Sequence, residues 1–225
     1  MSSNGVFLTV NASGAVKAAE ANNVVMIVDV IDMSTTLEAA IDAGALCVFG
    51  ASPDQCRAPV RLSPEEIGRQ AGMLAVREGT KVVVVSEPRV GTEEERRARS
   101  ARVISGIEEA GALVEAVFPN AGAETAKLGD FKGKVVVAVS DTGGVAYDAA
   151  VTAGAPVVLT GTIARTVHKK GPEPARAAAK RAMEAAARSG TGIAVVAASA
   201  NSLEDILAAE YIVREIIAMG FTARP

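Results

Sequence analysis

The sequence predicts an α/β protein of three layers, with helices on both faces of a mostly parallel β-sheet. Apolar runs rich in β-branched residues alternate along the chain with segments of helical periodicity, as in strand–helix–strand units. The runs are apolar throughout, which is typical of strands buried on both faces. Hydrophobic residues make up 49% of the chain but aromatic residues only 3%, so the core must consist mainly of Val, Ala, Ile and Leu.

The length of 225 residues fits one domain that covers residues 1–225. Two lobes of similar build within that domain are left open. Gly and Pro residues punctuate the segment 119–134, and a boundary between lobes would fall there.

Charge and cysteine content exclude several classes of protein. The net charge is −3 and no block of one sign occurs, so nothing favours binding to nucleic acid. Two cysteines are too few for a disulfide framework or a thiolate metal site. The N-terminus lacks the pattern of a secretion signal, and no apolar run approaches the length of a membrane span. We therefore expect a cytoplasmic protein that binds no membrane, and a homodimer is left open.

The individual elements follow from apolar runs and helix start signals. Strands are predicted at 5–10, 24–28, 81–85, 112–118, 135–139, 156–160 and 193–197, and one more strand ends at Gly50. Helices are predicted after Thr36, at 63–79, from 92, at 174–188 and at 201–219, with 12–23 as a loop or short helix. The alternation requires right-handed crossovers between parallel strands.

The stretch 24–50 carries the strongest candidate site. Asp29 ends the buried strand 24–28, Asp32 follows three residues later, and a run of three hydroxyl residues opens the next helix. These three are Ser34, Thr35 and Thr36. Two carboxylates and hydroxyls at a strand end suit a metal-assisted phosphate site. The plainer alternative is a capped helix with Asp29 in a turn, and short motifs alone favour it.

Two later turns repeat this pattern of a strand followed by polar residues. They comprise Ser140, Asp141, Thr142 and Gly143 in one turn, and Thr160 to Thr162 in the other. In a parallel sheet all three turns fall on one edge, where helix N-termini attract anions. The sequence therefore indicates a small anionic, phosphorylated metabolite as ligand, although neither a P-loop nor a dinucleotide fingerprint is present.

Other catalytic chemistries lack the residues that they need. His168 is the single histidine and lies in a basic stretch, and no nucleophile elbow occurs, so a Ser-His-Asp or Cys-His triad is disfavoured. One histidine and two cysteines also make zinc a poor choice. A metal bound here should be hard and held by oxygen, which makes Mg²⁺ the expected cofactor.

Two motifs near the ends of the chain resemble those of a known family. Residues 29–36 read D-V-I-D-M-S-T-T with A-G-A at 43–45, and residues 202–209 read S-L-E-D-I-L-A-A. The 2-phosphosulfolactate phosphatase family carries D-V-[LI]-R-A-[ST]-T-T, A-G-A and S-L-E-D-[VI]-L-A-A in the same order. The resemblance covers roughly residues 20–60 and 132–215. It implies a Mg²⁺-dependent enzyme that hydrolyses a small acidic phosphomonoester.

The resemblance and the turn pattern together give a set of candidate site residues. The catalytic candidates are Asp29, Ser34, Thr35 and Glu204, and the metal ligands are Asp29 and Asp32. The candidates for substrate binding are Thr36, Ser140, Asp141, Thr142, Gly143, Thr162 and Arg165. For Asp205 a role in capping the last helix is preferred to metal binding, and for Glu204 both roles stay open.

The chain also departs from the family in ways that affect activity. The family's arginine after D-V-L is Asp32 here, its T-N-G-T-R turn has no arginine in residues 140–144, and its G-E-R-G-G segment is at best echoed in 86–91. Losing two guanidinium groups removes bidentate contacts to phosphate. An inactive homologue that binds an anionic metabolite or acts in regulation is therefore the alternative. Arg165 is the strongest candidate for a replacement cation, ahead of Arg89, Lys169 and Lys170, because a helix starting at Thr162 would place it in the first turn, near Asp29. The alternative for Arg165 is a plain surface position, and the usual exposure of arginine favours it.

Overall fold

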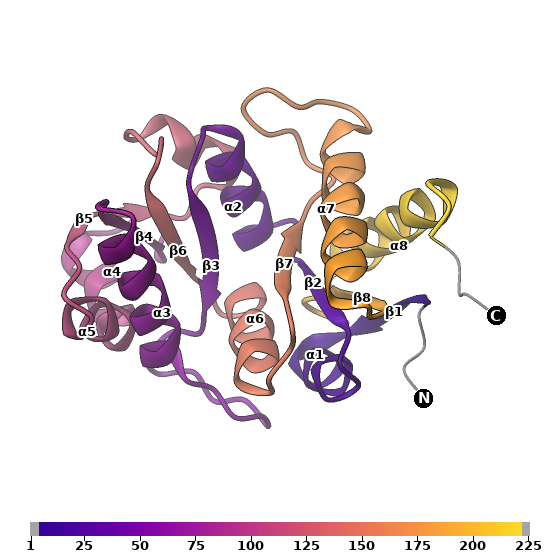
Figure 1. The fold of residues 1–225 in the computed structure, drawn as a ribbon. Coiled ribbons are helices and arrows are strands. Elements are labelled where there is room, and N and C mark those ends of the chain that lie inside the picture. The colour runs from indigo at the N-terminus through magenta and orange to yellow at the C-terminus, as the bar shows by residue number, and fades with distance from the viewer. Residues whose placement is uncertain (1–4, 222–225) are drawn as a thin grey trace.

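The computed structural model describes residues 5–221 and confirms the α/β class (Figure 1). Part of the N-terminus used in the secretion-signal argument, residues 1–4, lies outside the described residues. The strands are β1 Val6–Val10, β2 Val24–Val28, β3 Cys47–Ala51, β4 Val82–Ser86, β5 Val114–Pro119, β6 Val135–Val139, β7 Val158–Gly161 and β8 Ile193–Ala197. The helices are α1 Asn11–Glu20, α2 Met33–Asp42, α3 Pro64–Arg77, α4 Glu93–Arg99, α5 Ala101–Glu109, α6 Gly143–Thr152, α7 Glu173–Ser189 and α8 Leu203–Ala218, with a 3-10 helix η1 at Gly122–Lys127.

The strands of residues 5–221 form two separate four-stranded sheets, and every pair of neighbours is parallel. The first sheet has the order β1-β8-β2-β7 and the second the order β3-β6-β4-β5. The two ends of the chain thus build one sheet and the middle builds the other. The segment 119–134 joins β5 to β6 within the second sheet, so the chain does not change sheets at the expected lobe boundary.

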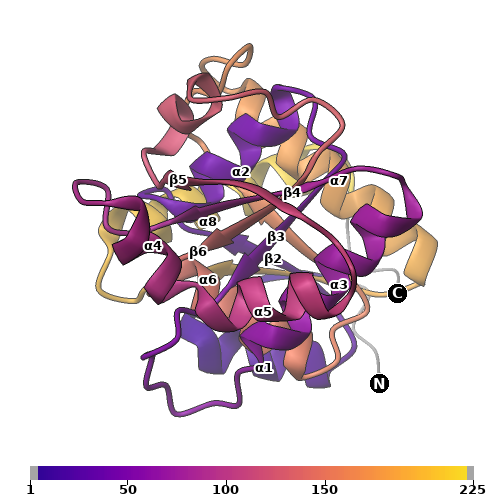
Figure 2. The same ribbon diagram turned by 90° about the vertical axis from the view of Figure 1, so that its left-hand side faces the viewer.

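The chain changes sheets through α2 and α6. Helix α2 leads from β2 to β3, and α6 leads back from β6 to β7. Figure 1 shows both helices between the edge strands β3 and β7, and each helix packs against both of these strands. Helices on the outer faces complete the three-layer arrangement, and Figure 2 shows α4 and α5 on the near side of the second sheet.

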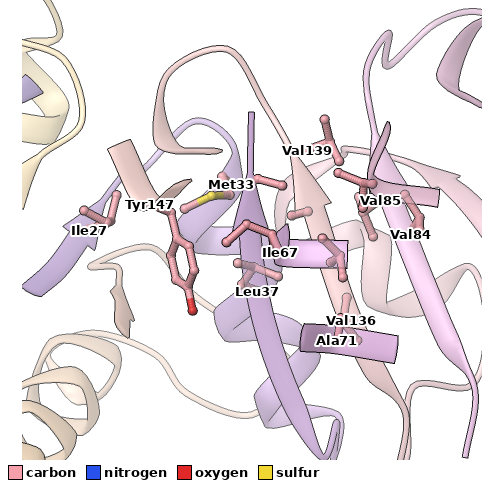
Figure 3. Packing of buried hydrophobic residues seen from close by; sticks show 14 of the residues in the cluster. Ile27, Met33, Leu37, Ile67, Ala71, Val84, Val85, Val136, Val139 and Tyr147 are labelled. Carbon is pink, nitrogen blue, oxygen red and sulfur yellow. The ribbon is translucent and has the colours of Figure 1, made fainter. Parts of the chain in front are cut away.

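Burial explains which apolar runs became inner strands. Strands β2, β4, β6 and β8 are buried along their whole length, and each lies between two neighbours in its sheet. Met33 and Leu37 of α2 and Tyr147 of α6 fill the space between Ile27 of β2 and the second sheet (Figure 3). Buried alanines of α7 pack on the other face of β2, where small side chains let helix and sheet approach closely.

One expectation about local structure is confirmed and another is corrected. Of the two alternatives for the segment 12–23, the short helix is present, as α1 at Asn11–Glu20. No helix begins at Thr162, because the chain between β7 and α7 is irregular and Thr162 accepts a hydrogen bond from the Ala164 N–H within a tight turn. Within residues 5–221 no helix is both long and apolar enough to cross a membrane.

Helices α3 and α5 touch through two glycines. A Cβ on Gly68 would lie 2.1 Å from the Val103 carbonyl oxygen, and one on Gly106 would lie 2.1 Å from the Glu65 carbonyl oxygen. These are backbone contacts, so neither neighbour can yield by rotating a side chain. The glycines therefore set the distance between the two helices.

We expect Gly106→Ala to destabilise the protein by about 2 kcal/mol, because the added methyl forces α5 away from α3. Helix propensity alone predicts the opposite sign, a gain of about 1 kcal/mol. Urea unfolding measures the difference, and Ser105→Ala, at an exposed position of the same helix, is the matched control. A Gly106→Ala variant as stable as the parent would contradict the packing argument.

Candidate functional site

The three predicted turns contact one another at the carboxyl ends of the strands. The carboxylate Oδ2 of Asp29, after β2, accepts hydrogen bonds from the Gly143 N–H at 2.8 Å and the Thr142 hydroxyl at 3.1 Å. The hydroxyls of Thr35 and Thr162 lie 2.8 Å apart and join the turns after β2 and β7. Residues distant in the sequence therefore converge on Asp29, as the parallel arrangement predicts.

Gly143 is required by the close approach of α6 to Asp29. A Cβ at this position would lie 2.3 Å from the Asp29 Oδ2 atom. Without a side chain, the first turn of α6 directs its free N–H group and its positive end at the carboxylate. This contact links the end of β2, in the first sheet, to the helix that follows β6 of the second sheet.

Asp29 is a buried carboxylate with one uncommitted oxygen. Its side chain is 1% exposed, and its Oδ1 has no hydrogen-bond partner within residues 5–221. The pKa of Asp29 is raised to about 6, mainly by burial and then by the negative charge of Asp205, and the hydrogen bonds from Gly143 and Thr142 offset only part of this rise. At neutral pH the group is mainly ionised and calls for a proton or a cation at Oδ1.

The hydroxyl run stabilises the turn after β2. The Ser34 hydroxyl donates to the Ile27 carbonyl at 2.9 Å and accepts from the Asp29 N–H at 3.0 Å. The Thr35 hydroxyl donates to the Val30 carbonyl at 2.7 Å, and the Thr36 hydroxyl donates to the Asn120 side chain at 2.6 Å. All three hydroxyl residues are buried. Each hydroxyl already donates its proton to a protein oxygen, so a contact with phosphate would require that bond to break. Their predicted contact with phosphate stays a prediction.

Asp32 faces a cation that comes from the turn after β4. Its carboxylate forms an ion pair with the Arg89 guanidinium, whose Nε also donates to the Asn120 carbonyl at 3.1 Å. Burial raises the pKa of Asp32, and Arg89 counters this by stabilising the charged form. Asp32, at the position where the motif it resembles has an arginine, is thus matched by an arginine from elsewhere in the chain.

Arg165, the preferred replacement cation, does not lie in this cluster. It is exposed in the irregular segment after β7, and its guanidinium pairs with Glu124 of η1 at 2.7 Å. The preference rested on a helix starting at Thr162, and that helix is absent from the described residues. Arg165 thus has the surface position that was its alternative, and Arg89 is the arginine that lies beside Asp32.

The two acids at the start of α8 have opposite environments. Glu204 is exposed, whereas Asp205 is 3% exposed and its Oδ1 accepts the Val30 N–H at 2.8 Å. Ser202 caps the helix by accepting the Asp205 N–H at 3.2 Å, so the predicted cap is confirmed. Asp205 is therefore the acid of this motif that reaches the site, and burial raises its pKa.

A cleft of about 560 Å³ lies beside Asp32. Its lining comprises Asp32, Glu87, Pro88, Arg89, Glu95, Ala98 and Arg99. A neighbouring hollow of about 330 Å³ shares Ala98 and Arg99 and adds Asp141 and Cys56. Burial and the charge of Asp141 raise the pKa of Glu87 to about 7, against the opposing effect of Arg99. Sequence reasoning missed Glu87 and Arg99, although Glu87 follows the predicted strand 81–85.

No group of three or more His, Cys, Asp or Glu side chains in residues 5–221 is placed to hold a metal ion. Of the two predicted metal ligands, Asp29 has a free oxygen, whereas Asp32 already pairs with Arg89. The expected Mg²⁺ therefore stays a prediction, with Asp29 as its best-placed ligand.

In comparison with known proteins, no family model and no curated protein matches this chain. The resemblance to the 2-phosphosulfolactate phosphatase family stays a prediction that rests on the two motifs.

The raised pKa of Asp29 makes a prediction about stability. Because the folded pKa of about 6 exceeds the unfolded value of 3.8, ionising Asp29 destabilises the fold as the pH rises through this window. Asp29→Asn removes the charge and keeps an oxygen for the Gly143 N–H. We expect it to raise the free energy of unfolding by on the order of 1–2 kcal/mol at pH 8.

At about pH 4 the same substitution should change the free energy of unfolding much less, because Asp29 is then neutral in the folded protein and about half protonated in the unfolded chain. Urea unfolding at pH 4 and pH 8, with EDTA present, measures both values. Asp130→Asn, at an exposed loop position, is the control for a general effect of charge. A variant less stable than the parent at pH 8 would show that Asp29 is held by a partner in the folded state.

Proposed function

We propose that this protein is a Mg²⁺-dependent hydrolase of a small acidic phosphomonoester, of the kind that the 2-phosphosulfolactate phosphatase resemblance implies. The observation that carries the proposal is the buried Asp29 carboxylate, with its free Oδ1 and its place at the N-terminus of α6. A buried, ionisable group of perturbed pKa at the carboxyl end of a central strand is a frequent feature of catalytic sites.

The free carboxylate oxygen of Asp29 is the kind of ligand that Mg²⁺ takes. Mg²⁺ is commonly bound by one or two carboxylates, with waters and substrate phosphate in the remaining positions. Asp29 Oδ1 would be the protein ligand, and the predicted contribution of Asp32 requires release from Arg89. When bound, Mg²⁺ would polarise the phosphoryl oxygens and favour attack by water.

The surrounding residues would orient the reacting groups. Gly143 and Thr142 fix the Asp29 carboxylate through Oδ2, which leaves Oδ1 for the ligand side. The buried hydroxyls of residues 34–36 hold the turn that carries Asp29. Since Asp29 is 1% exposed, binding would have to open the exposed turn at Asp141 and Thr142. The cytoplasmic location belongs to the same proposal, and the homodimer is left open.

A second candidate is a protein that binds an anionic metabolite, or regulates through it, without turnover. The Asp32–Arg89 pair favours it, because this pair occupies the second predicted metal ligand, which the hydrolase would need and a binding protein would not. Under this candidate the fold and the buried acid persist while the chemistry is lost.

Phosphate release from a panel of small phosphomonoesters with Mg²⁺ separates the two candidates. We expect turnover that EDTA abolishes, and Asp29→Ala should reduce kcat/KM by on the order of 100-fold or more, because it removes the ion's ligand. Asp130→Asn should retain the parent rate. Stabilisation by anionic metabolites with no phosphate release from any ester would instead support the binding protein.

A further inference from the structure

The cleft beside Asp32 has a charge pattern that the proposed phosphatase does not use. Carboxylates and guanidinium groups alternate along its lining, with Asp32 paired to Arg89 and Glu87 facing Arg99. The Glu87 and Arg99 side chains are 3.6 Å apart, and Arg99 also binds Asp141 at 2.7 Å. The cleft therefore offers both a cationic and an anionic position next to the turn that carries Asp29.

The charged groups of the cleft are held in place by a buried arginine. Arg96 is 9% exposed, and its Nη1 donates to the Pro88 carbonyl at 3.2 Å and the Gly91 carbonyl at 3.1 Å. These bonds fix the backbone of residues 87–91, which bears Glu87 and Arg89. A fixed backbone reduces the ordering that a ligand must pay for on binding.

The pattern of charges selects among ligands. A ligand with only negative groups would add to the carboxylates that already share Arg89 and Arg99 in a half-buried site, which is unfavourable. A group that carries both an ammonium and a carboxylate can exchange partners with the Glu87–Arg99 pair and leaves neither of these two charges unmatched. Asp29 and Asp205 behind the turn add further negative charge, which favours a ligand that brings an ammonium.

We propose that this cleft binds an α-amino acid group, with its ammonium on Glu87 and its carboxylate on Arg99, beside the intact Asp32–Arg89 pair. The ligand is then a phosphomonoester of a hydroxy-amino acid, with O-phosphoserine as the simplest probe. The assignment of the phosphate end rests on the proposed function, whereas the amino-acid end rests on the cleft alone.

Two matched pairs of compounds test the proposal. Serine and glycerate differ only by an ammonium in place of a hydroxyl, and so do O-phosphoserine and 3-phosphoglycerate. Calorimetric titration at pH 8, where Glu87 is ionised, should show at least about tenfold tighter binding of the amino compound in each pair. Equal affinities within both pairs would overturn the proposal.

Variants locate the preference in the cleft. Glu87→Gln should reduce the preference for the ammonium to within about twofold, because it removes the charged acceptor. Glu108→Gln, at an exposed position of α5, should retain the full preference, and thermal unfolding verifies that both variants fold. A preference unchanged in Glu87→Gln would place the ammonium elsewhere and overturn the assignment.

The same compounds keep this proposal distinct from the phosphatase. If O-phosphoserine binds preferentially but is not hydrolysed, the amino-acid assignment stands and the proposed hydrolase falls. If both phosphate esters are hydrolysed with equal kcat/KM, the hydrolase stands and the amino-acid assignment falls.

Discussion

The hydrogen bond from the Gly143 N–H to Asp29 joins the two halves of the molecule. Asp29 ends a strand of the first sheet, and Gly143 opens a helix that starts from the second. The contact needs a residue without Cβ at position 143 and an acceptor at position 29. The turns carrying Thr142, Thr35 and Thr162 then come together because their strands end at this junction.

The electrostatics of this junction show which force dominates. Two hydrogen bonds and a helix N-terminus favour ionised Asp29, yet its pKa is raised to about 6 because burial and Asp205 outweigh them. In the cleft, by contrast, each half-buried acid has a guanidinium beside it. The inner part of the site, around Asp29 and Asp205, thus lacks positive charge, whereas the acids and arginines of the cleft balance one another. A ligand that spans both parts must bring positive charge to Asp29 without leaving an acid or an arginine of the cleft unpaired.

Local features of the chain were predictable, and long-range pairings were not. Apolar runs such as 24–28 and 135–139 indicate buried parallel strands, because strand burial depends on a few consecutive residues. The division into two sheets depends on where α2 and α6 lead, which no local pattern encodes. Adjacent side chains on a helix point about 100° apart around its axis. Which of Glu204 and Asp205 is buried therefore depends on the face of α8 that packs inward, and this face carries Asp205. The Asp32–Arg89 pair joins residues 57 positions apart, and only the tertiary fold brings them together.

The placement of β8 has a consequence for synthesis of the chain. This last strand lies between β1 and β2, the first two, so the first sheet cannot form until residue 197 has left the ribosome. The apolar strand β2 would wait without its partners for on the order of ten seconds or more at ordinary translation rates. Meanwhile the second sheet, built from residues 47–139, can pair completely. The nascent chain thus presents unpaired strand edges for a long interval, which makes β1 and β2 natural clients for a chaperone that shields apolar segments during translation.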